Sequence, residues 1–326
     1  MSLLPFEKIK REILIKKDAT TNPNQGCIPE ERSIPELINY GCVTINKPQG
    51  PTSHQISDYV QKILEIKKAG HPGTLDPNVT GCLPVILKDA TKLTHSLLKA
   101  GKEYICLMYI HKKVSQAQIN KAMNMFIGKI TQLPPIKSAV KRQERQREIY
   151  YLEILEIKGQ NVLFKVGCEA GTYIRKLCHD IGLALETNAH MAQLIRTKAG
   201  PFNDKNWFSL YELKDAYEFY KQGDEKQLRK ILLPMEFAVS HLPKIWITDS
   251  TVNAICHGHN LAIPGISKLH SKIEENDQVA VFSLKDELIA LGKAMINSKD
   301  IMKLEKGIAV NIHKVIMKPE TYQNVS

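Results

Sequence analysis

Apolar and polar positions follow two different periods along this chain. In residues 52–66, the apolar side chains from Ile56 to Leu64 recur at helical spacing, which predicts one amphipathic helix. Residues 149–170 alternate instead, as the strands YYLEILEIK and VLFKVGCEA, and the segment 159–161 (Gly-Gln-Asn) between them is a turn signal. Helices and a strand hairpin are therefore expected in the same chain.

The remaining segments extend this mixed pattern. Further strands are predicted at residues 42–48, 82–87 and 103–110, and helices at 92–98, 172–185 and over most of 209–241. Short strand patterns bounded by Gly, Pro and Asp then follow at residues 242–249, 278–284, 287–295 and 310–317. The fold class is expected to be α+β, with a mixed or antiparallel central sheet flanked by helices.

We expect three parts along the chain. Residues 1–35 form a basic amino-terminal extension, which ends in a loop rich in Pro, Asn, Thr and Gly. Residues 36–242 form the main α+β domain, and residues 243–319 form a small β-rich domain.

The charge of the chain favours a polyanionic partner. Its 326 residues include 45 Lys and Arg against 34 Asp and Glu, a formal charge of +11. Residues 243–319 hold ten Lys and eight acidic residues, so most of the positive excess lies in residues 1–242. This balance favours nucleic acid first and an acidic membrane surface second, although many proteins carry such charge for solubility alone.

Cysteine spacing and hydropathy indicate the cellular compartment that we expect for this protein. The seven cysteines are widely spaced without a C-x-x-C pair, which argues against a disulfide framework and a zinc ribbon and fits a reducing compartment. The first residues, MSLLPFEKIK, lack the apolar stretch of a signal peptide. No segment reaches the ~20 apolar residues that span a bilayer. We therefore expect a soluble, intracellular protein without a membrane partner.

The most informative segment is G-H-P-G-T-L-D-P at residues 70–77. Two glycines and two prolines impose a tight, rigid backbone between a helix and a strand. This loop carries one acid, Asp76, and one histidine, His71, and a rigid loop is a good platform for chemistry. The same residues also suit a structural turn in which Asp76 caps a backbone N–H. The residues alone leave both interpretations open.

Residues 70–77 resemble the active-site motif of the TruB/dyskerin family of pseudouridine synthases. Four further segments resemble motifs of that family in the same order: GCVTINKPQGPTS at 41–53, KEY at 102–104, GTYIRKL at 171–177 and RTKAGPF at 196–202. The resemblance covers about residues 30–320, nearly the whole chain. It implies the pseudouridine synthase fold and the conversion of uridine to pseudouridine in RNA.

The resemblance also assigns roles at the site. It makes Asp76 the nucleophile, with Arg175 and Tyr104 as the other catalytic residues. An arginine favours the ionised carboxylate and fixes its orientation, while Tyr104 stacks on the everted uracil and helps to move a proton. The substrate-binding residues that it implies are His71, which helps to hold the RNA, Leu177, which packs on the other face of the base, and Lys47. On the residues alone, a strand tyrosine is usually core and a helical arginine usually forms a surface ion pair.

Uridine isomerisation breaks a C–N glycosidic bond and forms a C–C bond, without redox change or phosphoryl transfer. The chemistry therefore requires no cofactor, and the sequence contains no P-loop, no G-x-G-x-x-G signal and no convincing metal cluster. Chemistry on a base requires the nucleotide to leave its stack, at a cost of about a few kcal/mol. We expect neither a cofactor nor a metal.

Other segments resemble the guide-dependent branch of the family. They are residues 134–142 and 149–151, and, similar to its PUA domain, residues 242–247, 254–258, 260–266 and 287–294. This branch implies H/ACA guide RNA, substrate rRNA or tRNA, and three accessory proteins: a Nop-type zinc-ribbon protein, a Gar-type protein and a kink-turn-binding ribosomal-protein-like subunit. It also implies that the extension 1–35 packs on a PUA domain at 243–319, and that the protein is archaeal and cytoplasmic.

Two groups of residues are candidates for RNA binding. The first is a basic stretch whose phosphate contacts would make binding salt-dependent, although a solvated surface has the same composition; it comprises Lys137, Lys141, Arg142, Arg145 and Arg147. The second lies in the β-rich domain and comprises His257, Gly258 and Gly265. The local sequence CHGH at 256–259 lacks further ligands at metal-site spacing, so a turn near RNA is the better interpretation.

Three other functions remain open from the sequence. A guide-independent enzyme acting on the T-loop of transfer RNA is the nearest, and a non-catalytic RNA-binding scaffold is a rival from another class. A glycoside hydrolase using Asp76 would need a second positioned carboxylate, for which the sequence offers no convincing candidate.

Overall fold

The computed structural model describes residues 2–133 and 143–323, and these residues fall into two compact units. The first unit comprises Met1–Lys8, Val43–Val85 and Thr94–Asp224, and the second comprises Ile9–Cys42, Ile86–Leu93 and Glu225–Ser326. The expected amino-terminal extension is thus divided, because its first eight residues belong to the first unit. No helix in the described part of the chain is long and apolar enough to cross a bilayer.

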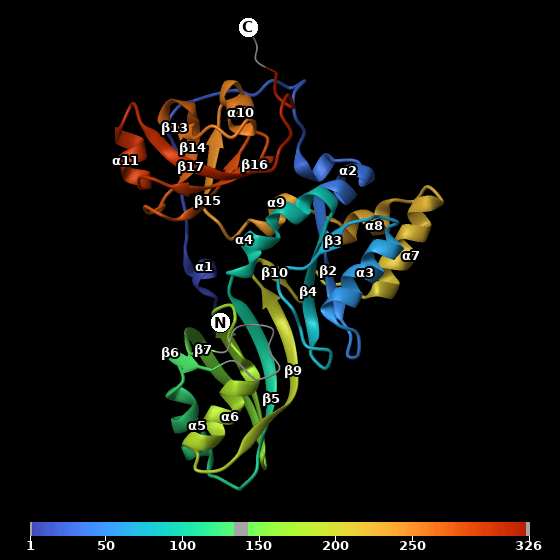
Figure 1. Cartoon of the computed structure of the whole chain (residues 1–326), viewed down its shortest axis with the longest axis vertical. Coiled ribbons are helices and arrows are strands. Elements are labelled where there is room, and N and C mark those ends of the chain that lie inside the picture. The colour runs from blue at the N-terminus through green and yellow to red at the C-terminus, as the bar shows by residue number, and fades with distance from the viewer. Residues whose placement is uncertain (1, 134–142, 324–326) are drawn as a thin grey trace. The chain divides into compact units, whose positions relative to one another are not determined.

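The first unit is built on a mixed sheet with the strand order β2-β4-β9-β5-β8-β7-β6 (Figure 1). The strands are β2 (Gly41–Lys47), β4 (Thr80–Leu87), β5 (Lys102–Ile110), β6 (Gly128–Gln132), β7 (Arg145–Lys158), β8 (Asn161–Cys168) and β9 (Ala189–Ala199). β4 pairs with β9 in parallel, whereas β5 pairs antiparallel with both β8 and β9. The α+β class and the mixed sheet are confirmed.

The hairpin expected between residues 149 and 170 is formed by β7 and β8. Lys158 pairs with Asn161, so the turn consists of Gly159 and Gln160. Gly159 has a positive φ of 62°, a backbone conformation that glycine adopts without a steric penalty. The two strands β3 (Ala69–Gly70) and β10 (Phe202–Asn203) are short additions at β4 and β9.

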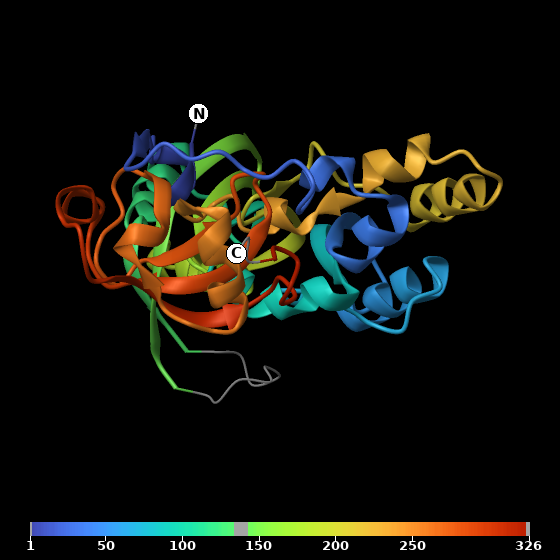
Figure 2. The ribbon, with the colours of Figure 1, turned by 90° about the horizontal axis from the view of Figure 1, so that it is seen from above.

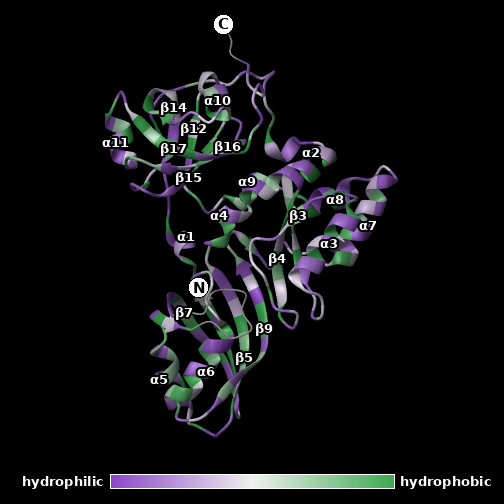
Figure 3. Ribbon diagram, in the orientation of Figure 1, coloured by the Kyte–Doolittle hydropathy of each residue, from purple (hydrophilic) through white to green (hydrophobic). Residues whose placement is uncertain are grey.

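Most helices of the first unit bury one apolar side, whereas the short helix α1 buries no residue. They are α1 (Pro5–Lys8), α3 (Ser53–Ile63), α4 (Thr94–Leu98), α5 (Gln116–Asn124), α6 (Ile174–Ala184) and α7 (Leu210–Lys221). The Thr52 side chain accepts a hydrogen bond from the Gln55 backbone N–H, which fixes the start of α3. Along α6, apolar and polar residues occur side by side (Figure 3), and Ile174, Cys178 and Ile181 are buried.

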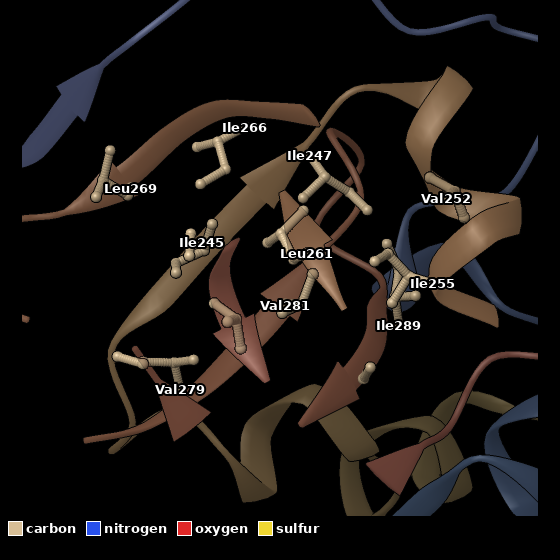
Figure 4. Packing of buried hydrophobic residues seen from close by; sticks show 14 of the residues in the cluster. Ile245, Ile247, Val252, Ile255, Leu261, Ile266, Leu269, Val279, Val281 and Ile289 are labelled. Carbon is tan, nitrogen blue, oxygen red and sulfur yellow. The ribbon is translucent and has the colours of Figure 1, made fainter. Parts of the chain in front are cut away.

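The second unit contains a seven-stranded sheet in the order β1-β14-β12-β15-β16-β17-β13. Its strands are β1 (Ile13–Ile15), β12 (Lys244–Ile247), β13 (Leu261–Ala262), β14 (Ile266–His270), β15 (Gln278–Phe282), β16 (Leu288–Ala294) and β17 (Ile308–Val315). Side chains such as Ile245, Leu261 and Val281 gather in one interior (Figure 4). This closed apolar core explains the alternating pattern after residue 242.

Short helices complete the second unit. They are η1 (Pro29–Glu31), α2 (Ile34–Asn39), η2 (Lys88–Leu93), α8 (Lys226–Ile231), α9 (Met235–Ala238), α10 (Asp249–Cys256), η3 (Ile263–Gly265) and α11 (Ser298–Lys303). The two-residue strand β11 (Leu233–Pro234) pairs with Gly41 and Cys42. The helix α10 did not emerge from the sequence pattern, because only Val252, Ile255 and Cys256 of its eight residues are buried.

Residues 9–33 run along the β-rich part of the second unit (Figure 2). β1 pairs antiparallel with β14 and forms one end of that sheet. Farther along, the Asp249 carboxylate accepts hydrogen bonds from the Thr21 hydroxyl and the Asn22 N–H, at 3.0 and 2.7 Å. The buried pair Arg32 and Glu236, 2.8 Å apart, follows, and Glu236 also accepts from a backbone N–H of β16.

Candidate active site

Asp76 lies in the loop between β3 and β4, and its carboxylate forms a salt bridge with Arg175 in the first turn of α6. Both side chains remain open to solvent, with 56% of Asp76 and 55% of Arg175 exposed. Within the described residues, the Asp76 carboxylate accepts a hydrogen bond from the Arg175 guanidinium and none from a backbone N–H. The arrangement favours the catalytic interpretation of Asp76 over a structural cap.

Lys47, at the end of β2, anchors the loop that carries Asp76 through hydrogen bonds to backbone carbonyls. Its side chain is fully buried, and its ammonium donates to the carbonyl oxygens of Pro48, Pro77 and Val79 at 2.9, 3.0 and 2.9 Å. Burial lowers the pKa of Lys47, and the negative charge of Asp76 opposes that shift. We expected Lys47 to bind the substrate. Instead all three of its donors are used inside the protein, so it positions the loop.

A serine fixes the loop just before Asp76. The Ser53 hydroxyl, buried at the start of α3, donates to the Leu75 carbonyl at 3.0 Å and accepts from the Leu75 N–H at 2.8 Å. On the other side, the Pro77 carbonyl accepts from the Gly50 N–H at 3.0 Å. Both neighbours of Asp76 are therefore held by hydrogen bonds, which leaves its side chain little freedom of direction.

Arg196 anchors an earlier part of the same loop and was not assigned a role from the sequence. Only 2% of its surface is exposed, and its guanidinium donates to the carbonyls of Cys82 at 2.8 Å and Gly73 at 3.3 Å. It lies on β9 directly across from Tyr104 on β5. The segment RTKAGPF was the signal for this residue, but its sequence does not show which atoms the guanidinium reaches.

Tyr104 is half-buried on β5. Burial raises the pKa of Tyr104 to about 12, against the opposing effect of Arg196, and the charge of Asp76 adds slightly to the rise. The hydroxyl therefore stays protonated near neutral pH and is able to donate a hydrogen bond. Arg196 lies directly across from Tyr104 in the sheet, and the negative charge of Asp76 contributes to the raised pKa of Tyr104.

The two residues before Tyr104 are fixed by buried contacts. The Lys102 ammonium donates to the Ala100 carbonyl at 2.6 Å, and burial, helped by Arg196, lowers the pKa of Lys102 to about 8. The Glu103 carboxylate is 5% exposed and accepts from the hydroxyls of Tyr151 at 2.5 Å and Thr197 at 2.7 Å. Side chains from β7 and β9 thus hold the start of β5 in place next to Tyr104.

His71 lies in a pocket beside the loop. Its Nδ1 is 3.1 Å from the Ser57 hydroxyl, and its ring meets the His54 ring edge-on with centroids 4.9 Å apart. Burial, and next the neighbouring His54, lowers the pKa of His71 to about 4, so the ring is neutral at pH 7. The pocket measures about 420 Å³, and Thr74 and Thr94 also line it. A neutral ring suits contact with a base or ribose better than pairing with a phosphate.

Leu177 does not reach the surface. We expected it to pack on the face of the base, but its side chain is 0% exposed and lies on the buried side of α6. In this structure it helps to seat the helix that carries Arg175, and it offers no surface to a nucleotide.

The basic stretch is described only in part. Lys137, Lys141 and Arg142 lie outside the described residues. Arg147, on β7, has an ion pair with Glu169 at 3.5 Å, and its Nε lies 3.1 Å from the point where a Cβ on Gly171 would stand. Arg145, also on β7, pairs in register with Gln132 on β6. Both arginines are half-buried along this strand pair.

The candidates in the β-rich domain divide into two kinds. His257, the C-cap of α10, and Gly258 after it are exposed, and Gly258 has a φ of 87° with open space around its Cβ position. Gly265 is buried instead, and an added Cβ would stand 2.7 Å from the Thr251 side chain. We expected Gly265 to bind RNA, but it permits close packing against α10. Cys256 is buried, and the described residues contain no group of three metal-binding side chains.

Known families match almost the whole chain. The TruB family pseudouridylate synthase (N terminal domain) matches residues 61–174, and the tRNA pseudouridylate synthase B C-terminal domain matches residues 175–240. A PUA domain matches residues 243–316, and a DKCLD (NUC011) domain matches residues 2–57.

Curated relatives cover the same length. The chain is 53% identical over 320 residues to "Probable tRNA pseudouridine synthase B" of Methanosarcina acetivorans, covering 98% of this chain and 94% of the relative. It is 54% identical over 323 residues to the protein of the same name from Pyrococcus horikoshii, covering 98% of this chain and 96% of the relative.

Solved structures are similar over the full chain. One is described as "Structure of H/ACA RNP bound to a substrate RNA containing 2'-deoxyuridine", with 50% identity, a TM-score of 0.93 and coverage of 99% of this chain and 100% of that chain. Another is "Crystal Structure of a Cbf5-Nop10-Gar1 Complex", with 52% identity, a TM-score of 0.93 and coverage of 98% of both chains.

Proposed function

Because this chain belongs to the TruB family of pseudouridine synthases, we propose that it isomerises uridine in RNA with Asp76 as the nucleophile. The observation that carries this assignment is the salt bridge between Asp76 and Arg175 at an exposed loop. A carboxylate held in one orientation by a guanidinium, and still open to solvent, is suited to attack on an everted nucleotide.

The reaction detaches the uracil by breaking the bond between ribose C1′ and N1, turns the base, and joins C1′ to C5. The proton of C5 is released and N1 is protonated, so the product is an isomer of the substrate. Asp76 supplies the ionised oxygen, and Arg175 holds it. Tyr104 contacts the everted base, and its protonated hydroxyl relays a proton. The neutral ring of His71 helps to hold the RNA in its everted conformation.

We also propose that the chain works as the catalytic subunit of an H/ACA ribonucleoprotein. Its partners are an H/ACA guide RNA, substrate rRNA or tRNA, a Nop-type zinc-ribbon protein, a Gar-type protein and a kink-turn-binding ribosomal-protein-like subunit. Support comes from the full-length similarity to chains in an H/ACA RNP with substrate RNA and in a Cbf5-Nop10-Gar1 complex. The archaeal sources of its relatives favour an archaeal, cytoplasmic location.

The parts of the chain divide this work. Residues 36–242 form the catalytic domain, and the PUA domain over 243–319 binds RNA. Of the extension 1–35, the part after Lys8 packs on the PUA domain. The pairing of β1 with β14 supports this last role. On the PUA domain, exposed His257 and Gly258 are the candidates for contact with the guide.

The test is the variant Asp76→Asn in the assembled ribonucleoprotein with a guide and its target. Pseudouridine formation should fall below detection, while RNA affinity changes by less than about threefold, because the amide keeps the shape of the side chain and loses its charge. Asp215→Asn, an exposed position on α7, is the matched control. Full activity of the Asp76→Asn variant would exclude the mechanism.

A guide-independent activity on transfer RNA is the second candidate, and the names of the curated relatives favour it. The purified chain alone is to be assayed on transfer RNA and on a guide-dictated target. Modification of the guide-dictated target without guide or accessory proteins would contradict the proposed partners.

A further inference from the structure

Gln132, the last residue of β6, forms hydrogen bonds with the backbone just ahead of α6. Its side-chain amide accepts a hydrogen bond from the Tyr173 N–H at 2.9 Å and donates to the Tyr173 carbonyl at 3.2 Å. Only 2% of Gln132 is exposed. A buried amide that satisfies both backbone groups of one residue fixes the position and the rotation of that residue together.

Tyr173 is the N-cap residue of α6. Its carbonyl also accepts from the Leu177 N–H at 3.0 Å, so the residue gripped by Gln132 begins the hydrogen-bond ladder of the helix. Arg175 follows in the first turn and reaches Asp76 from there. A shift of Tyr173 would therefore move the start of α6 and the guanidinium with it.

The strand that carries Gln132 is itself well held. β6 pairs antiparallel with β7 over its whole length, from Gly128 opposite Ile149 to Gln132 opposite Arg145. The backbone of β7 is joined to the segment before α6, because the Glu148 carbonyl accepts from the Glu169 N–H at 2.8 Å. The hydrogen bonds between Gln132 and Tyr173 thus tie the first turn of α6 to the β6–β7 strand pair.

We propose that Gln132 is a positioning residue for the reaction: it holds the first turn of α6 so that Arg175 meets the carboxylate of Asp76. Gln132 does not touch the reacting atoms and acts through Arg175. This role rests on the proposed function. A misplacement of about 1 Å at a catalytic group lowers a rate by about a hundredfold, so a lost grip should appear in the chemical step rather than in RNA binding.

The variant Gln132→Glu separates the two hydrogen bonds. An ionised carboxylate still accepts from the Tyr173 N–H but no longer donates to the Tyr173 carbonyl, whereas a protonated carboxyl donates again. Single-turnover rates of the assembled ribonucleoprotein are to be measured relative to wild type from about pH 8 to about pH 5, a range in which a buried carboxyl becomes protonated. Relative to wild type, the rate of the Gln132→Glu variant should be about tenfold lower near pH 8 and should recover toward about pH 5.

The matched control is Gln160→Glu in the β7–β8 turn. Gln160 also donates its side-chain amide to a backbone carbonyl, that of Ile110, at 2.8 Å. Its relative rate should stay near that of wild type at every pH. Equal pH profiles for the two variants, or an unimpaired Gln132→Glu variant, would overturn the role of Gln132. An inactive wild-type assembly would instead contradict the proposed function.

A second variant keeps the test decisive if acid pH harms the complex. Gln132→Met removes both hydrogen bonds, and its rate should fall by about 10- to 100-fold while RNA affinity stays within about threefold. In an Arg175→Lys background the same change should cost much less, because both substitutions disturb one unit. If the two substitutions reduce the rate additively, or if RNA affinity falls as much as the rate does, Gln132 has only a structural role.

Discussion

Arg175 bonds Asp76 across 99 positions of the chain. Two separately anchored elements bring them together: the loop before β4, held by Lys47 and Ser53, and the first turn of α6, held by Gln132. Neither side chain is buried, so the contact is maintained by its supports rather than by its own strength.

Removing Arg175 should therefore affect catalysis far more than folding. In the variant Arg175→Met, we expect the single-turnover rate to fall by about 100- to 1000-fold, because a preorganised charge at the reacting group is lost. The melting temperature should change by less than about 2 °C, since an exposed ion pair contributes little to stability. Calorimetry and a rate assay on the same preparation check both expectations, and a large loss of stability would contradict them.

Arg196 should behave in the opposite way. The variant Arg196→Lys keeps the charge, but one ammonium cannot replace both the bond to the Cys82 carbonyl and the bond to Gly73. An unsatisfied buried polar group costs about 1–3 kcal/mol, so the free energy of unfolding should fall by that amount in urea denaturation. The control is Arg229→Lys, a more exposed arginine that also donates to a backbone carbonyl. Similar losses in the two variants would show that Arg196 has no special anchoring role.

His71 should make the protein sensitive to acid. Its pKa in the folded protein is lowered to about 4 from an ordinary value of 6.5, so its neutral form is favoured by folding. The stability that this provides is present above pH 6.5 and is lost as the pH falls through 4. The variant His71→Gln should remove this part of the pH dependence in melting curves.

His270 is the matched control for that measurement, because burial also lowers the pKa of His270 to about 4 in the second unit. The variant His270→Gln should flatten the pH dependence of the second unit and leave that of the first unchanged. If neither variant alters the acid limb of the melting curve, the two rings are not responsible for it.

Two glycines of the PUA domain should respond differently to alanine. In Gly265→Ala, the added Cβ meets Thr251 at 2.7 Å, and overpacking of this kind typically costs about 1–3 kcal/mol. In Gly258→Ala, the methyl group enters open space, and the loss is limited to about 1–2 kcal/mol for the positive φ. Filter binding of guide RNA should weaken more for Gly258→Ala when both variants are folded, because only Gly258 is exposed.

Strong periodic signals predicted much of the fold. The helix at 53–63 and the hairpin of β7 and β8 both form as expected, because each has an apolar pattern of sufficient length and a clear cap or turn. α5 and β6 were not predicted. Their sequences, QAQINKAMN and GKITQ, are short and largely polar, and they are stabilised by packing that a local pattern does not contain.

The site shows a similar division. The motif resemblance brought Asp76 and Arg175 to attention, and the structure joins them. It could not distinguish residues that meet the substrate from residues that support them, since that depends on burial. Lys47 and Leu177 are both fully buried. From the sequence alone, a lysine near a catalytic loop is expected to be exposed. Gln132 and Arg196 bond to backbone groups of other segments, whose directions depend on the tertiary fold.

The strand β1 has a consequence for how the protein is made. Glu12, just ahead of that strand, bonds Ser271, which lies 259 positions later. At a synthesis rate of about 5–20 residues per second, the leading segment waits roughly 10–50 s on the ribosome before its partner strand emerges. The edge of this sheet is therefore completed only after β14 has been synthesised, and until then the segment that forms β1 is open to chaperones and proteases.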